Sequence, residues 1–478
     1  MSEAEILHRL AEVVGPRGII DAVPDMDGYV ADWRNLNRGR ALCVLRPDST
    51  QAIAAAVKLC ADAGVAIVPQ GGNTSMVDGA TPDASAGQVV LSLTRLNRVR
   101  AIDEIDMTMT LDAGVIVKAA QDAAAEVGCV FPLSFSAEGT ATIGGALSTN
   151  AGGNNTIRYG NARDLMLGLE VVLPDGRIWN GLRSLRKDNT GYALKHLFAG
   201  AEGTLGVITG AVMKLVQQAR SEELLFCAVP SVDAALRLYR RFRSQDESSL
   251  RAFEYLSGLA VDMVVQTIEG VSLPFPARAD HYVLIDLAST RTNDTLRDLA
   301  ENILAEALEA GDVSDAVIAE NLAQRRALWR LREEQSEAQK RVGANVKNDV
   351  SVPVSRVPDL IRLGAEVVTR LFPGVRAVPF GHMGDGNIHL NFVKPEGLDD
   401  QAFLSRSGEL MEAVNAVVRD LGGSFSAEHG IGRLKVDTMA DWREGAELDL
   451  MRAIKTAIDP RGVLNPGKIF KTETRGRQ

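Results

Sequence analysis

Three turns rich in glycine and small polar residues constrain the fold of this chain more than any other feature. Their sequences are PQGGNTS at 69–75, GTATIGGALSTNAGG at 139–153 and GAEGTLG at 200–206. The first turn ends an apolar run, and the third leads into a predicted strand. Backbone N–H groups in such turns can approach phosphate oxygens closely. We therefore expect an α/β region whose turns could together line a long anionic ligand.

The sequence between these turns alternates short apolar runs with helical patterns. We predict strands at 42–47, 66–69, 89–93 and 107–111, and helices at 49–64 and 117–128. Each turn alone is compatible with an ordinary tight turn. Because Ile143 and Leu147 lie inside the second turn, we favour a packed element there over low complexity. No turn matches G-x-G-x-x-G or G-x-x-x-x-G-K-[ST], so neither a Rossmann site nor a P-loop is predicted.

The composition argues against two classes of protein. The 478 residues carry 62 acidic and 52 basic side chains, and the net charge of -10 argues against a nucleic-acid-binding surface. No apolar run approaches the length that crosses a bilayer. The N-terminal segment is acidic where a signal peptide is basic, and the four cysteines form no C-x-x-C pair. We expect buried, reduced thiols and a cytoplasmic location.

The sequence pattern changes after about residue 218. We predict strands at 224–229, 251–256 and 282–287, separated by charged helices. This pattern indicates a second α+β domain with helices on one side of an antiparallel sheet. One long helix is expected over 315–341, in which Arg332 and Ser336 stand four residues apart and would share a face. A strand follows at 346–352, with Lys347 near its start.

A predicted hairpin holds the densest group of side chains that can bind a metal. Its strands are expected at 375–380 and 388–393, and His382 and His389 stand on either side of the turn between them. Alternation along the second strand would place His389 and Asn391 on one face. Two imidazoles and a nearby amide suit a divalent metal, but they equally suit a hydrogen-bonded histidine pair.

Two further polar residues lie at the end of a strand predicted at 422–432. Glu428 is a third candidate metal ligand, and His429 is a neighbouring polar group that need not be a ligand. A Glu-His pair alone is usually structural or exposed. With the hairpin histidines, it would complete a set of three metal ligands and leave one histidine for other chemistry.

The order and spacing of the three turns resemble the FAD domain of the vanillyl-alcohol oxidase type. The resemblance implies that loop 71–75 cradles the FAD pyrophosphate, and that 139–145 and 204–208 line the flavin and ribityl chain. The implied FAD contacts are Pro69, Gly71, Gly72, Asn73, Thr74, Ser75, Gly139, Thr140, Thr142, Ile143, Gly144, Asn150, Gly152, Gly153, Thr204, Val207, Ile208 and Asn465. Members that bond flavin covalently through this loop use a histidine, and Asn73 therefore implies non-covalent FAD.

The motifs LRE at 331–333, KND at 347–349, GHMGDGNIH at 381–389, SAEHG at 426–430 and NPGK at 465–468 are similar to those of FAD-dependent D-2-hydroxyacid dehydrogenases. The D-2-hydroxyglutarate dehydrogenases are the most similar group. This resemblance implies that His382, His389 and Glu428 bind a divalent metal, zinc in this family. It implies that Arg332, Ser336, Lys347, Asn391 and His429 bind the substrate, with His429 as the base. Ser336 stands where relatives often have threonine, and it keeps the hydroxyl.

The implied reaction removes the hydroxyl proton of a 2-hydroxy acid and transfers the Cα hydride to N5 of FAD. A metal with an open position would lower the pKa of the hydroxyl, and His429 would accept its proton. Arg332 and Lys347 suit carboxylates, and two cations beside a metal favour a dicarboxylate, 2-hydroxyglutarate first and malate second. D-lactate or D-malate dehydrogenase is the alternative within this fold. A zinc hydrolase, or a non-catalytic subunit, is the alternative outside it.

The expected architecture is α+β with four segments. These are an N-terminal helical segment at 1–35, a two-subdomain FAD-binding domain at 36–218, a substrate- and metal-binding cap domain at 219–440, and a C-terminal helical segment at 441–478 that returns to the FAD domain. Because the sequence holds no nicotinamide fingerprint, we expect electrons to leave through a carrier such as electron-transfer flavoprotein or a quinone. A homodimer is compatible with the sequence.

Overall fold

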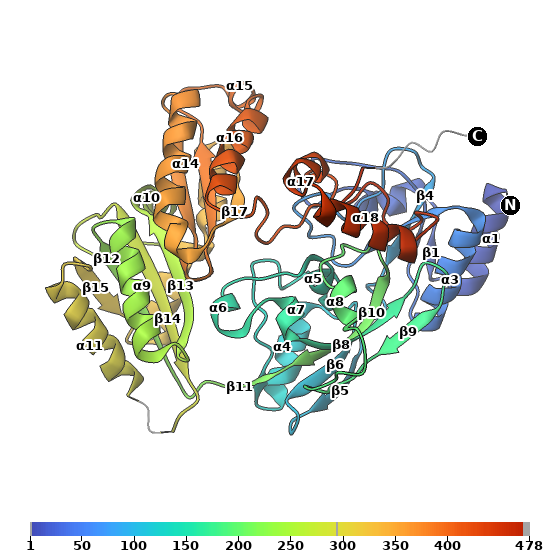
Figure 1. The fold of residues 1–478 in the computed structure, drawn as a ribbon, viewed down its shortest axis with the longest axis horizontal. Helices are drawn as coiled ribbons and strands as arrows, with labels where there is room; N and C mark the ends of the chain where they lie inside the picture. The colour runs from blue at the N-terminus through green and yellow to red at the C-terminus, as the bar shows by residue number, and fades with distance from the viewer. Residues whose placement is uncertain (1, 293–294, 472–478) are drawn as a thin grey trace. The chain divides into compact units, whose positions relative to one another are not determined.

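The computed structural model describes residues 2–292 and 295–471, which form two compact units (Figure 1). Among the described residues, the first unit contains 2–152, 159–217 and 428–471, and the second contains 153–158, 218–292 and 295–427. By these contacts, the predicted N-terminal segment 1–35 groups with the first unit. The second unit ends at Ala427, whereas we expected the cap domain to continue to residue 440.

A four-stranded sheet in the first unit carries the first glycine turn. Its strands are β1 (Ile19–Ile20), β2 (Ala41–Leu45), β3 (Ala66–Gln70) and β4 (Gln88–Ser92), in the order β1-β2-β4-β3. Strands β2, β4 and β3 are parallel, as expected where helix α3 (Thr50–Ala63) connects β2 to β3. The Ser49 hydroxyl caps the start of α3, and Gly64, with a left-handed φ of 70°, ends it.

A second sheet in the first unit is antiparallel. It consists of β5 (Val99–Asp103), β6 (Thr108–Asp112), β10 (Val207–Lys214), β8 (Met166–Val172) and β9 (Ile178–Gly181), in that order. Strands β7 (Cys129–Val130) and β11 (Val216–Gln217) form a separate pair. One continuous apolar core joins both sheets, helix α3 and helix α5 (Ile143–Thr149). The two sheets with a shared core match the two subdomains expected for this half.

The remaining helices of the first unit are short, except α1, α4 and α18. They are α1 (Glu3–Val14), η1 (Val23–Met26), α2 (Asp27–Val30), α4 (Val117–Glu126), α7 (Ala162–Leu165), α8 (Lys195–Phe198), α17 (Val436–Trp442) and α18 (Ala446–Ile458). The N-terminal segment is therefore only partly helical. A further short helix, α6 (Thr156–Tyr159), lies where the chain passes between the two units.

The second unit is built on one large antiparallel sheet. Its strands are β15 (Asp315–Ile318), β12 (Ser221–Val229), β14 (His281–Ser289), β13 (Leu250–Ser257), β18 (Arg376–His382), β19 (Asn387–Val393) and β16 (Asn345–Val346), in that order, with β17 (Asp349–Ser351) also paired to β19. The predicted hairpin is β18 and β19, and the short helix η3 (Met383–Asp385) forms its turn. The strand expected at 346–352 is split into β16 and β17.

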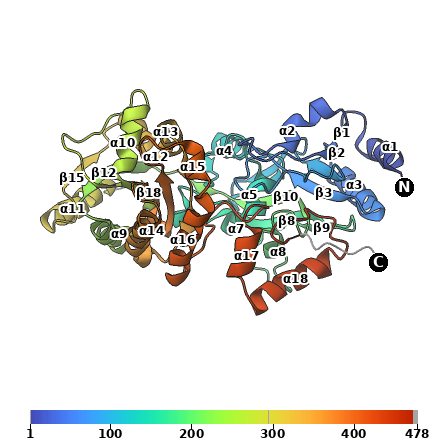
Figure 2. The same cartoon turned by 90° about the horizontal axis from the view of Figure 1, so that it is seen from above.

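Helices cover both faces of this sheet, so the expectation of helices on one side was wrong (Figure 2). Helices α10 (Gly258–Thr267), α12 (Leu322–Glu333) and α13 (Gln335–Val342) share an apolar core with one face, which includes Val378 and Phe380. On the other face, Tyr239 of α9 (Val232–Asp246) packs edge-on against Phe253. The other helices are α11 (Leu296–Glu309), η2 (Val354–Arg356), α14 (Val357–Leu371), α15 (Asp400–Leu404) and α16 (Ser407–Asp420).

Two further predictions for the second half were wrong. The single helix expected over 315–341 is strand β15 followed by α12 and α13, which meet at Glu334. The strand expected at 422–432 is irregular and makes one isolated bridge, between Ser424 and Ser351. Over the described ranges, no helix is long and apolar enough to cross a bilayer. All four cysteines are buried and unbridged, as expected.

Candidate active site

The loop at 71–75 in the first unit presents a row of unused backbone donors. The N–H groups of Gly71, Gly72, Asn73, Thr74 and Ser75 donate to no acceptor among the described residues, although the loop is only half-exposed. The Ser75 hydroxyl instead accepts from the N–H groups of Val77 and Gly79, which shapes the turn after the loop. Consecutive free N–H groups in a tight turn form a concave site for an anion such as a pyrophosphate.

The second glycine turn packs directly under this loop. Thr142 caps the start of α5, and a Cβ on Gly71 would collide with the Thr142 hydroxyl. A Cβ on Gly72 would collide with the carbonyl oxygen of Thr140. Both positions therefore require glycine for a close approach. The structure thus brings together residues 71–72 and 140–145, which the sequence separates by about seventy positions.

The third turn joins the same group through backbone hydrogen bonds. The N–H groups of Gly200 and Glu202 donate to the carbonyls of Leu147 and Ser148 in α5, at 2.9 and 2.8 Å. The Asn465 side chain donates to the carbonyls of Glu202 and Gly79, at 2.7 and 3.0 Å. All three turns and Asn465 therefore converge within the first unit, as a single site for one long ligand requires.

The other predicted FAD contacts lie around this junction. Thr204 is buried and donates its hydroxyl to the carbonyl of Ala201, so it supports the turn. The predicted residues Pro69, Gly139, Ile143, Gly144, Asn150, Gly152, Val207 and Ile208 belong to the first unit. Gly153 groups with the second unit. Asn150 ends α5 in the left-handed region, with a φ of 53°.

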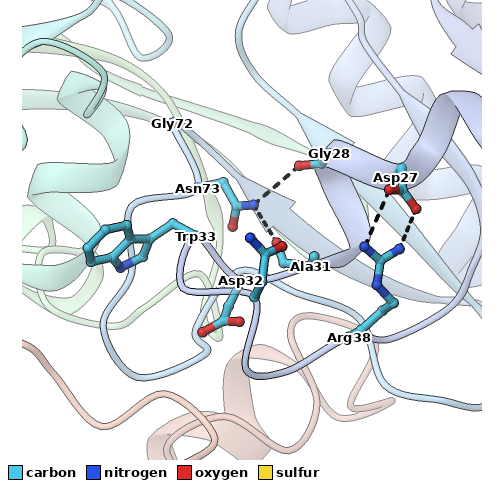
Figure 3. A pocket seen from close by; sticks show the side chains of 9 residues that line it. Asp27, Gly28, Ala31, Asp32, Trp33, Arg38, Gly72 and Asn73 are labelled. Carbon is cyan, nitrogen blue, oxygen red and sulfur yellow. Dashed lines mark hydrogen bonds and ion pairs between the residues drawn. The ribbon is translucent and has the colours of Figure 1, made fainter. Parts of the chain in front are cut away.

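A pocket of about 340 Å³ adjoins the first loop (Figure 3). Residues 27–38 form one wall, and Gly72 and Asn73 form the other. The Asn73 amide donates to the carbonyl of Ala31 at 2.8 Å, which ties the loop to this wall. Since ligand pockets span about 300–1,000 Å³, this one has room for part of a dinucleotide beside the free N–H groups.

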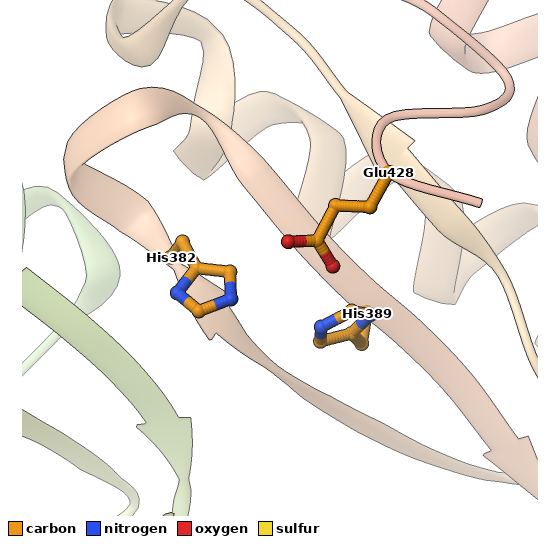
Figure 4. A group of neighbouring side chains, drawn as sticks. All are labelled: His382, His389 and Glu428. Carbon is orange, nitrogen blue, oxygen red and sulfur yellow. The ribbon is translucent and has the colours of Figure 1, made fainter. Parts of the chain in front are cut away.

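Three side chains that could bind a metal lie close together, namely His382 and His389 of the second unit and Glu428, the first residue beyond it (Figure 4). His382 ends β18, His389 lies on β19, and their ring centroids are 6.0 Å apart. Glu428 directly follows the last residue of the unit, Ala427, whose N–H donates to the carbonyl of Asp349 in β17. One ligand atom from each of the three residues lies within 4.8 Å of the others. Two imidazoles and a carboxylate are a common ligand set for catalytic zinc.

Each of these two histidines has an acidic cross-strand neighbour, which the sequence did not reveal. His382 pairs in register with Glu254 of β13, and His389 pairs with Asp349 of β17. His382 Nδ1 lies 2.7 Å from Glu254 Oε1, and His389 Nδ1 lies 4.0 Å from Asp349 Oδ1. Glu254 stands 128 positions before His382, and only the strand pairing brings them together.

Glu254 also holds Arg332, one of the predicted substrate ligands. The Arg332 Nε donates to Glu254 Oε2 at 2.6 Å, and both side chains are buried. Burial by itself would raise the pKa of the Glu254 carboxyl, but the charges of His382 and Arg332 and their hydrogen bonds lower it to about 2. The Arg332 guanidinium also lies over the Phe380 ring, 5.1 Å from its centroid. This arginine is therefore held rigidly beside the metal-binding group.

Asp349 forms a second group with Glu428 and His429, also within 4.8 Å of one another. The Asp349 side chain accepts a hydrogen bond from the Asn387 amide at 3.0 Å. His429, the predicted base, therefore lies next to Glu428, a candidate metal ligand, and to a buried aspartate.

The remaining predicted substrate residues have differing environments. Asn391 is buried, and its amide accepts from the Asn348 N–H and donates to Gln339 Oε1. Lys347 and Ser336 are exposed. Because Arg332 lies in the last turn of α12 and Ser336 in the first turn of α13, they lie on two helices, and the expected single helix face does not exist.

Comparison with known proteins identifies the family. Residues 41–181 match the FAD binding domain, and residues 218–469 match the C-terminal domain of FAD linked oxidases. A D-2-hydroxyglutarate dehydrogenase of Xanthomonas citri is 36% identical over 94% of this chain and 93% of its own length. The mitochondrial D-2-hydroxyglutarate dehydrogenase of Bos taurus is 36% identical over 96% and 82%. A putative mitochondrial D-lactate dehydrogenase of Schizosaccharomyces pombe is 36% identical over 93% and 84%.

Solved structures support the same fold. A substrate-bound p-cresol methylhydroxylase covers 98% of this chain and 97% of its own, with a TM-score of 0.74 at 16% identity. An alkyldihydroxyacetonephosphate synthase covers 98% of this chain and 85% of its own, also with a TM-score of 0.74, at 17% identity. With the full-length relatives, these matches show that the chain belongs to the family of FAD-linked oxidases, in the vanillyl-alcohol oxidase type of fold.

Family membership argues against one of the alternatives left open by the sequence, the zinc hydrolase. The zinc hydrolase hypothesis treated the glycine segments as ordinary turns. The free N–H groups at 71–75 and the match to an FAD binding domain contradict that hypothesis. The protein is a flavoprotein.

Proposed function

We propose that this protein oxidises a D-2-hydroxy acid with FAD as the hydride acceptor, and that D-2-hydroxyglutarate is its preferred substrate. The observation that carries the proposal is the group formed by His382, His389 and Glu428 with a buried arginine held beside it. It lies in a chain that aligns over 94% of its length with a D-2-hydroxyglutarate dehydrogenase. A cation site next to an anchored guanidinium suits a substrate with both a hydroxyl and a carboxylate.

The side chains of His382, His389 and Glu428 fit a divalent cation, and we propose that this cation is zinc. Both histidines can present a ring nitrogen, and Glu428 supplies a carboxylate oxygen. A bound cation would supply Lewis acidity that lowers the pKa of the substrate hydroxyl. His382 Nδ1 lies against Glu254, and Nε2, which lies 3.3 Å from Arg332 Nη2, is the ring nitrogen that would take this role.

Each chain residue then has a separate task in the proposed reaction. His429 accepts the hydroxyl proton, because it lies beside Glu428 and therefore next to the proposed metal site. Arg332 binds a substrate carboxylate through the guanidinium edge that Glu254 does not use. Lys347, Ser336 and Asn391 are the further proposed substrate contacts. Bound FAD would supply the acceptor for the Cα hydride at N5.

Two cationic side chains favour a dicarboxylate over a monocarboxylate. Arg332 and Lys347 would each offer a partner to one carboxylate, and D-lactate has only one. Because the chain is similar to a putative D-lactate dehydrogenase, oxidation of D-lactate is a second candidate activity. Oxidation of D-malate, a shorter dicarboxylate, is a further candidate. Steady-state kcat/KM values for the three D-acids distinguish them. The proposal expects D-2-hydroxyglutarate to give the highest value, and a higher value for D-lactate would contradict the dicarboxylate assignment.

The electron acceptor and the location belong to the proposal as well. The sequence holds no nicotinamide fingerprint, so we propose electron-transfer flavoprotein or a quinone as the acceptor. Buried, unbridged cysteines agree with a cytoplasmic location, although the Bos taurus relative is named as mitochondrial. Reduction of either acceptor by enzyme and D-2-hydroxyglutarate can be followed directly. Reduction of NAD instead would contradict the proposed acceptor class.

A further inference from the structure

A single buried carboxylate, that of Glu254, contacts both a proposed metal ligand and a proposed substrate ligand. Glu254 is 1% exposed and lies on β13, in direct register with His382 of β18. Its Oε1 is 2.7 Å from His382 Nδ1, and its Oε2 is 2.6 Å from Arg332 Nε. The two carboxylate oxygens are therefore divided between a proposed metal ligand and a proposed substrate ligand.

The two contacts of Glu254 fix the tautomer of His382 and the orientation of Arg332. Because a buried carboxylate accepts hydrogen bonds, His382 carries its proton on Nδ1, and its Nε2 holds a lone pair. The bond from Arg332 Nε fixes the plane of the guanidinium, whose Nη2 lies 3.3 Å from His382 Nε2. Arg332 Nη2 therefore lies at the same ring nitrogen that would bind a metal, so a bound metal would take the place of this contact.

We propose that Glu254 is the positioning residue that sets metal affinity and substrate binding together. It does so by fixing the His382 tautomer and the Arg332 orientation with one rigid carboxylate. This inference rests on the proposed function, which makes His382 a ligand and Arg332 a substrate contact. Partners of this kind behind a metal-bound histidine change metal affinity or activity by about 10- to 100-fold when they are replaced.

The same sheet provides a matched control. Asp286 of β14 is 3% exposed and accepts hydrogen bonds from Arg251 and Arg325, at distances from 2.7 to 3.2 Å. It pairs in register with Ala252, two residues before Glu254. Like Glu254, it is a buried carboxylate that holds arginine, but none of its contacts is a histidine or a proposed site residue. Replacing Asp286 therefore measures how much stability the protein loses when a buried carboxylate network of this sheet is broken.

The experiment compares Glu254→Gln with Asp286→Asn in the full-length holoenzyme. An amide in place of Glu254 accepts from only one of its two donors and opposes the other with its own N–H groups. We expect Glu254→Gln to weaken Zn²⁺ and Co²⁺ binding by about 10- to 100-fold, measured by competition with a chromophoric chelator. We also expect a changed Co²⁺ absorption spectrum, a raised KM for D-2-hydroxyglutarate and unchanged flavin content. Asp286→Asn should lower the melting temperature and leave metal affinity and KM unchanged.

The possible results separate this inference from the proposed function. Wild-type metal affinity and KM in Glu254→Gln, in a protein whose wild type binds metal, would overturn this inference alone. Equal losses of metal affinity in both variants would assign Glu254 an ordinary structural role and overturn it too. A wild-type protein that binds neither metal at His382, His389 and Glu428 would overturn the proposed metal site itself. Should Glu254→Gln not fold, Glu254→Asp, which keeps the charge but shortens the reach, is expected to change metal affinity in the same direction.

Discussion

At the scale of single residues, Arg332 carries the most specific prediction about substrate. Its guanidinium is buried, stacked over Phe380 and anchored through Nε, so only its other nitrogens are left to bind a carboxylate. Arg332→Ala should lower kcat/KM for D-2-hydroxyglutarate by about ten- to a hundredfold, because hydrogen bonds to charged groups contribute about 1.5–3 kcal/mol.

The flavin content of the Arg332→Ala protein provides the control. The glycine turns belong to the first unit and Arg332 to the second, so the variant should stay yellow. Removing Arg332 leaves Glu254 buried with one partner fewer, so a lower melting temperature is also expected. A colourless variant would place Arg332 in the flavin site and would refute its assignment to substrate.

A second residue-scale prediction concerns the glycine loop. A Cβ at Gly72 would collide with the Thr140 carbonyl, so Gly72→Ala must push apart the two turns that form the FAD site. Such overpacking costs about 1–3 kcal/mol. We expect a lower flavin-to-protein absorbance ratio in purified Gly72→Ala.

Gly87→Ala is the matched control for this loop. Gly87 lies just before β4 of the same sheet, and its added Cβ would make only an ordinary contact with the Ser85 hydroxyl. It should bind flavin as the wild type does. If Gly72→Ala bound flavin equally well, loop 71–75 would not be the pyrophosphate site.

At the scale of elements, the turn of the β18–β19 hairpin predicts a dependence of stability on pH. Burial raises the pKa of Asp385 in η3 to about 6, although the nearby His382 charge acts in the opposite direction. Its unfolded value is about 3.8. Between these values the folded protein binds more protons than the unfolded one, so the free energy of unfolding falls as pH rises. The total loss is about 3 kcal/mol.

The measurement is denaturant unfolding of wild type and Asp385→Asn from about pH 4 to about pH 7 in the presence of a chelator. Asparagine can keep the hydrogen bond from the Asn387 N–H while it removes the titration. The wild type should therefore lose stability relative to the variant across this window. A constant difference between the two proteins would show that Asp385 has an ordinary pKa.

The elements also show what sequence reasoning can find. Strong local patterns predicted β2, α3, β3 and the β18–β19 hairpin. Capping residues, alternation and glycine turns can each be recognised within a few consecutive residues. The break between α12 and α13 at Glu334 was missed, because helical periodicity continues across it. Glu254 was missed for a different reason. Its role comes from strand pairing with His382, and nothing near Glu254 in the sequence indicates this partner.

At the scale of the whole molecule, the proximity of the candidate site residues could be predicted where they lie in dense motifs. His382, His389 and Glu428 were chosen from the sequence and lie within 4.8 Å of one another. The convergence of the three glycine turns followed from their resemblance to a known domain, and the hydrogen bonds around α5 show it directly. The helices on both sheet faces had a sequence signal that was missed, because the near-continuous apolar runs at 224–229 and 282–287 are typical of strands buried on both faces.

Flavin and metal are expected to bind to different residues, so each should be removable without loss of the other. The glycine turns lie in the first unit, and His382 and His389 lie in the second. A chelator should therefore remove the metal and leave FAD bound, and the protein should keep its visible absorbance. Loss of flavin together with metal would contradict this division.

Anaerobic reduction of the bound flavin by D-2-hydroxyglutarate tests whether the protein oxidises this acid with the help of a bound metal. The measurement uses three preparations: wild type with metal, wild type after chelation and verified metal removal, and the chelated protein with Zn²⁺, Co²⁺ or Mn²⁺ restored. We predict rapid bleaching with metal, little after removal and recovery on restoration, with no reaction from the L-enantiomer. Rapid bleaching by the D-acid in the metal-free protein would contradict the metal's role. No bleaching by any D-2-hydroxy acid in the metal-loaded protein would contradict the proposed function.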